Sequence, residues 1–178
     1  LTVPRYVQAV QFTQYPGLSV DTLALPSTAF YVNTDGIPSY EDNRLLYGRG
    51  LKVKQNYTVA DGNPHYTAMD GILYNRDRTE LLGLPTERTR LVVGPEIINV
   101  HLPYQNHLTE LELTCTDIAQ LPEINYERLR RSCRIIVPDE LLNDFIAAES
   151  DTLQQTGLTV YPASRRDQGY MLRGDYLL

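Results

Sequence analysis

The sequence predicts a mainly β fold, a short solenoid of stacked strands with irregular connections and a capping helix near the C-terminus. Three observations indicate it: a strand-turn unit between Asn63 and Pro85, a near-periodic recurrence of an aliphatic residue followed by proline, and one amphipathic segment beginning at Pro138. A fixed repeat of about 20 to 29 residues is typical of solenoids, in which each coil buries its apolar edge by stacking on its neighbours.

The strand-turn unit combines tight turns with short apolar strands. Asp70-Gly71 favours a turn, Ile72-Leu73-Tyr74 is long enough only for a strand, and residues 75 to 78 reverse the chain before Leu81-Leu82 returns. We interpret this segment as one unit of a repeat.

The aliphatic-proline dipeptides extend the repeat along the chain. They occur at Leu25-Pro26, Leu84-Pro85, Leu102-Pro103, Leu121-Pro122 and Val137-Pro138. The last four are separated by 18, 19 and 16 residues, slightly less than a regular solenoid repeat. This spacing predicts further coils within residues 89–98, 108–115 and 133–142.

A known family shares these features in the same order. The Asp-Gly-Ile-Leu-Tyr unit that ends in Leu-Gly-Leu-Pro, the Leu-x-x-Leu-x-Leu coil from Leu108 to Leu113, and Ile-Ile-Val-Pro before an apolar helix resemble the BspA-type leucine-rich repeats of bacterial proteins. The resemblance extends from about Asn63 to Glu149. It implies a right-handed leucine-rich-repeat solenoid, located at the bacterial cell surface or secreted.

Length and composition are those of a compact globular domain. The chain has 178 residues, of which 42% are hydrophobic and 21% charged. We expect residues 1–150 to form the solenoid, with 1–50 irregular, and residues 151–178 to be a C-terminal cap or tail of the same domain. Alternation from Val7 to Phe12 predicts a strand, and Thr22 to Pro26 would end an earlier coil.

One helix is predicted from Pro138 to Glu149, with proline at its first position and acidic residues in its first turn. We expect it to cover the last coil through one apolar face, formed by Leu141, Leu142, Phe145 and Ile146. A second short turn is expected between Ile124 and Arg131. The tail from Thr152 to Leu178 is expected to add one or two strands or to remain loose.

The net charge of −6 argues against a nucleic-acid partner, which would require a basic stripe. We interpret the arginine clusters as solvated faces of helices and loops; they are Arg128, Arg130, Arg131, Arg134 and Arg165-Arg166. No apolar run approaches the roughly eighteen residues of a membrane span. The sequence begins at Leu1 rather than Met, so any export signal would have been removed and its absence carries no weight.

The two cysteines, Cys115 and Cys133, are 18 residues apart, which is about one coil. They either form a disulfide, if their Cα atoms lie within about 7 Å, or pack as two buried thiols. Two cysteines without a Cys-x-x-Cys pair, together with three scattered histidines, do not support a metal site.

No catalytic residue or cofactor is predicted. His65, His101 and His107 lie in turns or at strand ends, and neither Gly-x-Ser-x-Gly nor His-Glu-x-x-His occurs. Glu110 and Glu112 alternate along one strand and could flank a glycosidic bond, but such a pair is far more often a solvated face.

A short parallel-strand solenoid offers an extended surface suited to binding, so we predict a non-enzymatic binding module for protein-protein interaction or adhesion. The family resemblance implies adhesion to host proteins, other bacteria or a matrix. On that basis the outward residues of the exposed strands are candidate contacts: Arg90, Glu110, Glu112 and Thr114, with Tyr104 at a coil edge. Arg173-Gly174-Asp175 has the sequence that integrin-binding loops use, but such three-residue matches are mostly inert, and a turn before a last strand is the favoured explanation.

Two other functions remain open. Thirteen tyrosines suggest a carbohydrate-binding or carbohydrate-processing accessory protein, because aromatic faces stack on sugar rings. Exposure of Tyr57, Tyr66 and Tyr74 on one face would favour this function, and their burial would count against it. Alternatively, the chain is a structural segment of a larger surface protein. The sequence identifies neither the protein or polysaccharide ligand nor the oligomeric state.

Overall fold

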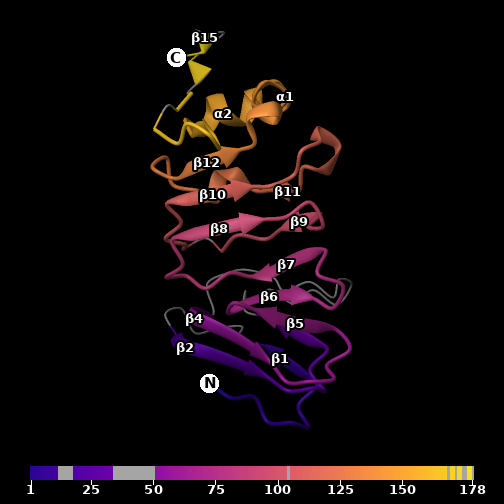
Figure 1. The fold of residues 1–178 in the computed structure, drawn as a ribbon. Helices are drawn as coiled ribbons and strands as arrows, with labels where there is room; N and C mark the ends of the chain where they lie inside the picture. The colour runs from indigo at the N-terminus through magenta and orange to yellow at the C-terminus, as the bar shows by residue number, and fades with distance from the viewer. Residues whose placement is uncertain are drawn as a thin grey trace. The chain divides into compact units, whose positions relative to one another are not determined.

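A computed structural model describes residues 1–11, 18–33, 51–103, 105–167, 169–170, 172–173 and 176–177. The chain divides into two compact units. The first unit comprises Leu1–Arg88 and Asn99–Asn106, and the second comprises Thr89–Ile98 and His107–Leu178. Taken together, the described residues form mainly strands with few helices, which confirms the predicted mainly β class (Figure 1).

The first unit begins with parallel strand pairs. β2 (Leu18–Leu25) pairs with β4 (Leu51–Val59), and β1 (Ala9–Gln11) pairs with β3 (Tyr31–Asn33). The buried residues of each strand lie an even number of positions apart, as expected for strands with one face on a core. The core of this unit is largely aliphatic, with Leu23, Leu25, Val53, Leu73 and Leu82 among its members, and it also contains Tyr57 and Tyr66.

The strand-turn unit predicted to be one repeat is an antiparallel meander. β5 (Tyr66–Met69) pairs with β6 (Ile72–Asn75), which pairs with β7 (Glu80–Gly83). Asp70 and Gly71 have φ angles of 51° and 75°, so they form a turn that reverses the chain at once. Parallel neighbours need a longer crossover, and the next pairing in this sheet, between β7 and β9 (Asn99–Val100), is parallel.

The second unit contains the regular repeat. β8 (Arg90–Val93), β10 (Glu110–Leu113), β12 (Arg134–Val137) and β13 (Thr159–Pro162) form a parallel sheet in the order β13-β12-β10-β8. Register-matched positions 90, 110, 134 and 159 recur 20, 24 and 25 residues apart. The proline spacing therefore underestimates this period. One register column is entirely buried and aliphatic: Leu91, Leu111, Ile135 and Val160.

The predicted helix is present but divided. A 3-10 turn, η3 (Asp139–Leu141), leads into α1 (Leu142–Ala148), which lies next to the edge strand β13. A second helix, α2 (Ser150–Thr156), is not predicted by the sequence, and it extends into the tail that was expected to add one or two strands or to remain loose. Leu153 is its one buried residue, so it has almost no apolar periodicity, although Gly157 ends it in the left-handed conformation.

Short elements complete the second unit: η1 (Ile118–Gln120), β11 (Glu123–Ile124), η2 (Tyr126–Arg128), β14 (Leu172–Arg173) and β15 (Tyr176–Leu177). η2 lies inside the short turn predicted between Ile124 and Arg131. Among the residues that the structure describes, no helix combines the length and apolar character needed to cross a membrane.

Candidate functional site

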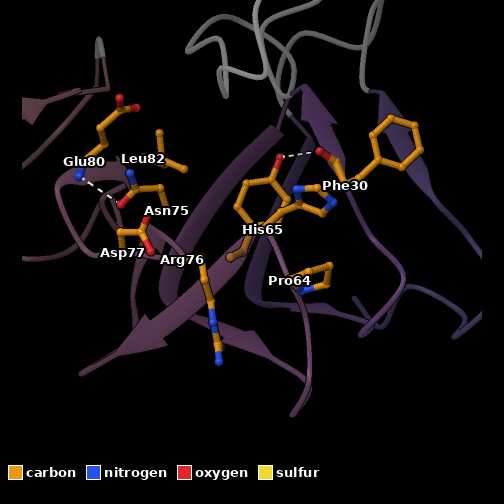
Figure 2. Close-up of a pocket in the computed structure, with 9 residues that line it drawn as sticks. Phe30, Pro64, His65, Asn75, Arg76, Asp77, Glu80 and Leu82 are labelled. Atoms are coloured by element: carbon orange, nitrogen blue, oxygen red, sulfur yellow. Dashed lines mark hydrogen bonds between the residues drawn. The ribbon is translucent and has the colours of Figure 1, made fainter.

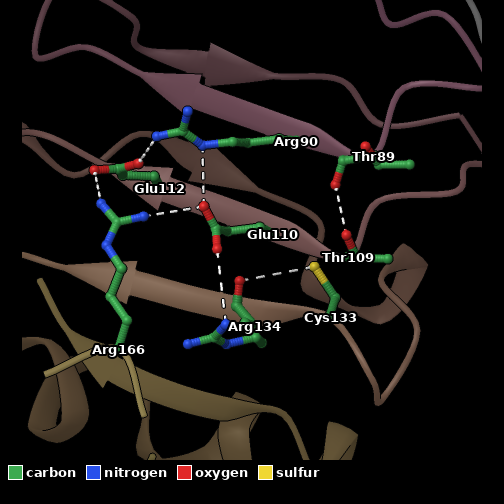
Figure 3. A network of polar contacts seen from close by, with 8 residues as sticks. All are labelled: Thr89, Arg90, Thr109, Glu110, Glu112, Cys133, Arg134 and Arg166. Carbon is green, nitrogen blue, oxygen red and sulfur yellow. Dashed lines mark hydrogen bonds and ion pairs between the residues drawn. The ribbon is translucent and has the colours of Figure 1, made fainter.

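The outward face of the second unit's sheet carries a network of arginines and glutamates. Arg90, Glu110 and Arg134 are register neighbours on β8, β10 and β12. Because side chains alternate along a strand, Glu112 lies on the same face as Glu110, opposite the buried aliphatic column. The Thr109 hydroxyl donates to the Thr89 carbonyl at 3.0 Å and joins the starts of β8 and β10 (Figure 3).

Each carboxylate of this network is held by at least two guanidinium groups. Arg90 donates from Nε to Glu110 Oε1 at 3.0 Å and from Nη2 to Glu112 Oε2 at 2.5 Å. Arg166 bridges the same two glutamates at 3.1 and 2.5 Å, and Arg134 Nη1 lies 4.0 Å from Glu110 Oε2. Three arginines thus surround two glutamates, which leaves a formal charge of +1.

The guanidinium groups cover the carboxylates. The side chain of Arg90 is 56% exposed, whereas those of Glu110 and Glu112 are 18% and 15% exposed. The face therefore presents arginine to solvent. The exposed Val92 lies beside Glu112 in the sheet register.

The network fixes the ionisation of Glu112. Burial alone would raise the pKa of this carboxyl, but the hydrogen bonds from Arg90 and Arg166 outweigh burial and hold its pKa below the usual value. Bonding to Glu112 raises the pKa of Arg90 in return. The general acid of a glycosidase needs a raised pKa, so the lowered pKa of Glu112 does not fit that role.

Arg166 reaches the network from the segment that follows β13. Ser164 anchors this segment by donating its backbone N–H to Asp139 Oδ1 at 2.9 Å and its hydroxyl to Asp139 Oδ2. Val160 and Tyr170 exchange backbone hydrogen bonds at 2.9 and 2.7 Å. Gly169 lies so close to Tyr161 that an added Cβ would approach Cζ to 2.5 Å.

Two arginines interpreted as solvated belong to this network, which corrects that interpretation. Arg134 also stacks over the Tyr161 ring, with its Cζ 4.4 Å from the ring centroid. An alignment of the coils that matches Arg90 with Glu110 would have placed Arg134 at the same position of the next strand. No sequence pattern points to Arg166, because its position depends on the path of the chain after β13.

The other predicted contacts are not part of the network. Thr114 follows β10, and its hydroxyl donates to the Val93 carbonyl at 3.2 Å. Tyr104 lies outside the described residues. Of the integrin-like motif, Arg173 belongs to β14, while Gly174 and Asp175 lie outside the described residues.

Both cysteines are free and buried. Cys133 precedes β12, beside the start of β10 at Glu110, whereas Cys115 lies beyond the end of β10 at Leu113. Five residues of extended chain span about 16 Å. This is more than twice the roughly 7 Å that a disulfide allows, so the register corrects the expectation that one coil of spacing makes the two cysteines neighbours.

The three tyrosines that were to test a carbohydrate function, Tyr57, Tyr66 and Tyr74, are all buried. Their rings are therefore not available to stack on a sugar. This observation counts against the tyrosine-based argument for carbohydrate binding.

These features define a strand-rich domain with a parallel, repeat-built sheet and a rigid charged face. No family profile matches the sequence, and a search of curated proteins finds no match. Among solved structures, the pneumococcal vaccine antigen PcpA is similar at 16% identity and a TM-score of 0.45, over 72% of this chain and 27% of that chain.

A leucine-rich repeat protein from Eubacterium ventriosum is also similar, at 15% identity and a TM-score of 0.34, over 73% of this chain and 36% of that chain. The chain thus spans about a third or less of the length of both structures. We base the proposals below on the chain's own geometry.

Proposed function

We propose that the chain is a non-enzymatic module that binds a protein partner through the charged sheet face of Arg90, Glu110, Glu112, Arg134 and Arg166. The observation that carries this proposal is the network itself, which holds several long side chains in fixed positions on a parallel sheet. Side chains that are already ordered lose little conformational freedom on association. Arginine is also enriched at protein interfaces.

The biological setting follows from the resemblance to BspA-type repeats. We propose a right-handed leucine-rich-repeat solenoid, secreted by a bacterium or attached to its surface, that serves in adhesion. The recurring register of β8, β10, β12 and β13 is consistent with stacked coils in the second unit. If the face has no ligand, the chain is instead a structural segment of a longer surface protein.

Binding of the purified chain to immobilised matrix proteins and polysaccharides, measured by biolayer interferometry, tests this proposal. We expect saturable binding to a protein that Arg90→Ala weakens, because Arg90 is the most exposed member of the network. Arg130→Ala is the matched control, since Arg130 is an exposed arginine of the same unit. An Asp175→Ala variant tests the integrin-like motif separately.

Equal binding by wild type and Arg90→Ala would show that the partner contacts another surface. Absence of binding to every member of the panel would favour the alternative that the chain is a structural segment of a longer surface protein. Loss of binding in Asp175→Ala alone would assign recognition to the integrin-like motif.

A further inference from the structure

The first unit contains a hollow of about 290 Å³ beside the β5-β6-β7 meander. One of its walls is aromatic and another is polar (Figure 2). Phe30 and His65 form the aromatic side, and Asn75, Asp77, Glu80 and Leu82 lie across from them. The hollow shares no residue with the charged sheet face of the second unit.

Hydrogen bonds hold the backbone that carries the aromatic side of the hollow. Phe30 is 42% exposed, and its ring centroid lies 6.3 Å from that of His65. Buried Asn63 donates to the carbonyls of Pro26 and Ala29 at 2.8 and 2.9 Å, and it accepts from the backbone N–H groups of His65 and Tyr66. The Tyr66 hydroxyl donates to the Phe30 carbonyl at 2.9 Å.

The polar side is built on the turn between β6 and β7. Asn75 donates from Nδ2 to the Thr79 hydroxyl at 2.8 Å, and its Oδ1 accepts from the Glu80 N–H at 3.0 Å. These bonds fix the turn that carries Arg76 and Asp77. In the part of the chain that the structure describes, no ion pair is formed by Asp77 or Glu80.

We propose that this hollow binds one ring of a neutral saccharide. A pyranose has an apolar C–H face that suits the Phe30 ring, while its hydroxyl groups both donate and accept hydrogen bonds. Asp77 and Glu80 are lining residues whose carboxylates accept such bonds. The volume is at the low end for small-molecule sites, which fits a single ring.

The charge of the polar side favours a neutral saccharide over an anion. The carboxylates of Asp77 and Glu80 would repel an anion. A neutral polyol donates hydroxyl hydrogen bonds to these carboxylates and places its C–H face on the aromatic side. The saccharide site is thus independent of the protein-binding face, and either proposal stands if the other fails.

Saturation-transfer NMR on the whole chain tests this site with methyl glycosides of glucose, galactose, mannose and N-acetylglucosamine. We expect millimolar binding of at least one glycoside. Phe30→Ala should weaken it roughly tenfold through loss of the stacking surface, whereas Phe30→Tyr should retain it. Tyr6→Ala, which removes an exposed aromatic of the same unit, should bind like wild type.

Glu80→Gln should also weaken binding, while Glu87→Gln, at an exposed position of the same unit, should not. Circular dichroism confirms that each variant is folded. Absence of binding by every glycoside, or equal binding by Phe30→Ala, would overturn the proposal. Binding of arginine methyl ester without any glycoside would also overturn it and would identify a cation site.

Discussion

At the scale of single residues, Glu112 shows how the charged face depends on its surroundings. Two arginines donate to its carboxylate, and these bonds lower its pKa despite partial burial. A carboxyl whose folded pKa lies below its unfolded value stabilises the protein above the unfolded pKa. This stabilisation is lost as the pH falls through the folded pKa.

We therefore expect the free energy of unfolding of wild type to fall between about pH 5 and pH 3, and Glu112→Gln to remove part of this dependence. At neutral pH the variant should lose about 1 kcal/mol, as for an ion pair near the surface. Urea unfolding across this pH range provides the measurement, with Glu87→Gln as the control. An unchanged pH profile in Glu112→Gln would contradict the assigned role.

The cysteines give a second prediction at this scale. Burial raises the pKa of the Cys133 thiol to about 11, and burial also raises the pKa of Cys115. Both effects suppress the reactive thiolate. Ellman titration should detect almost no thiol in the native protein and two per chain after denaturation, whereas an absence of thiols in denatured, unreduced protein would demonstrate a disulfide.

At the scale of elements, the β5-β6 hairpin depends on a glycine with both an unusual backbone and close neighbours. Gly71 has a φ of 75°, and its carbonyl accepts a hydrogen bond from the Tyr57 N–H at 2.8 Å. A Cβ added at Gly71 would lie 3.2 Å from the Gln55 carbonyl oxygen and would collide with the Asn56 side chain. Gly62 has a similar φ of 78°, but no atom lies within 4 Å of its added Cβ.

Comparing two alanine variants separates these effects. Gly62→Ala should cost about 1 kcal/mol through backbone strain alone. Gly71→Ala should cost about 2 to 4 kcal/mol, because steric crowding against β4 adds to the same strain. Thermal and urea unfolding give both values, and equal losses would show that the hairpin does not pack closely on β4.

At the scale of the whole molecule, each unit is stabilised by its own aliphatic core. Leu111 belongs to the buried column of the second unit's sheet, whereas Val92 lies on the exposed face of the same sheet. Leu111→Ala should lower the free energy of unfolding by about 2 to 5 kcal/mol, because it leaves a cavity. Val92→Ala should change it by less than about 1 kcal/mol.

Urea unfolding followed by far-UV circular dichroism measures both variants. A small effect of Leu111→Ala would mean that the parallel sheet does not contain the core of the second unit. A large effect of Val92→Ala would mean that the outward face is covered in the folded protein.

The mainly β class, the Pro138 helix and the tight turn at Asp70-Gly71 can all be predicted from local sequence. These features depend on local chemistry: residue alternation, proline and acidic residues at a helix start, and residues that tolerate positive φ. The sequence also placed Arg90, Glu110 and Glu112 on exposed strands. Each of these predictions needs only neighbouring residues.

The tertiary structure decided which strands are parallel and which side chains meet. The Asn63 to Pro85 segment folds back on itself, and Cys115 and Cys133 lie at opposite ends of neighbouring strands. Arg166 reaches two glutamates 54 and 56 residues earlier in the sequence. Long-range packing sets the strand register and the path of the chain, so the spacing of residues in the sequence does not predict either.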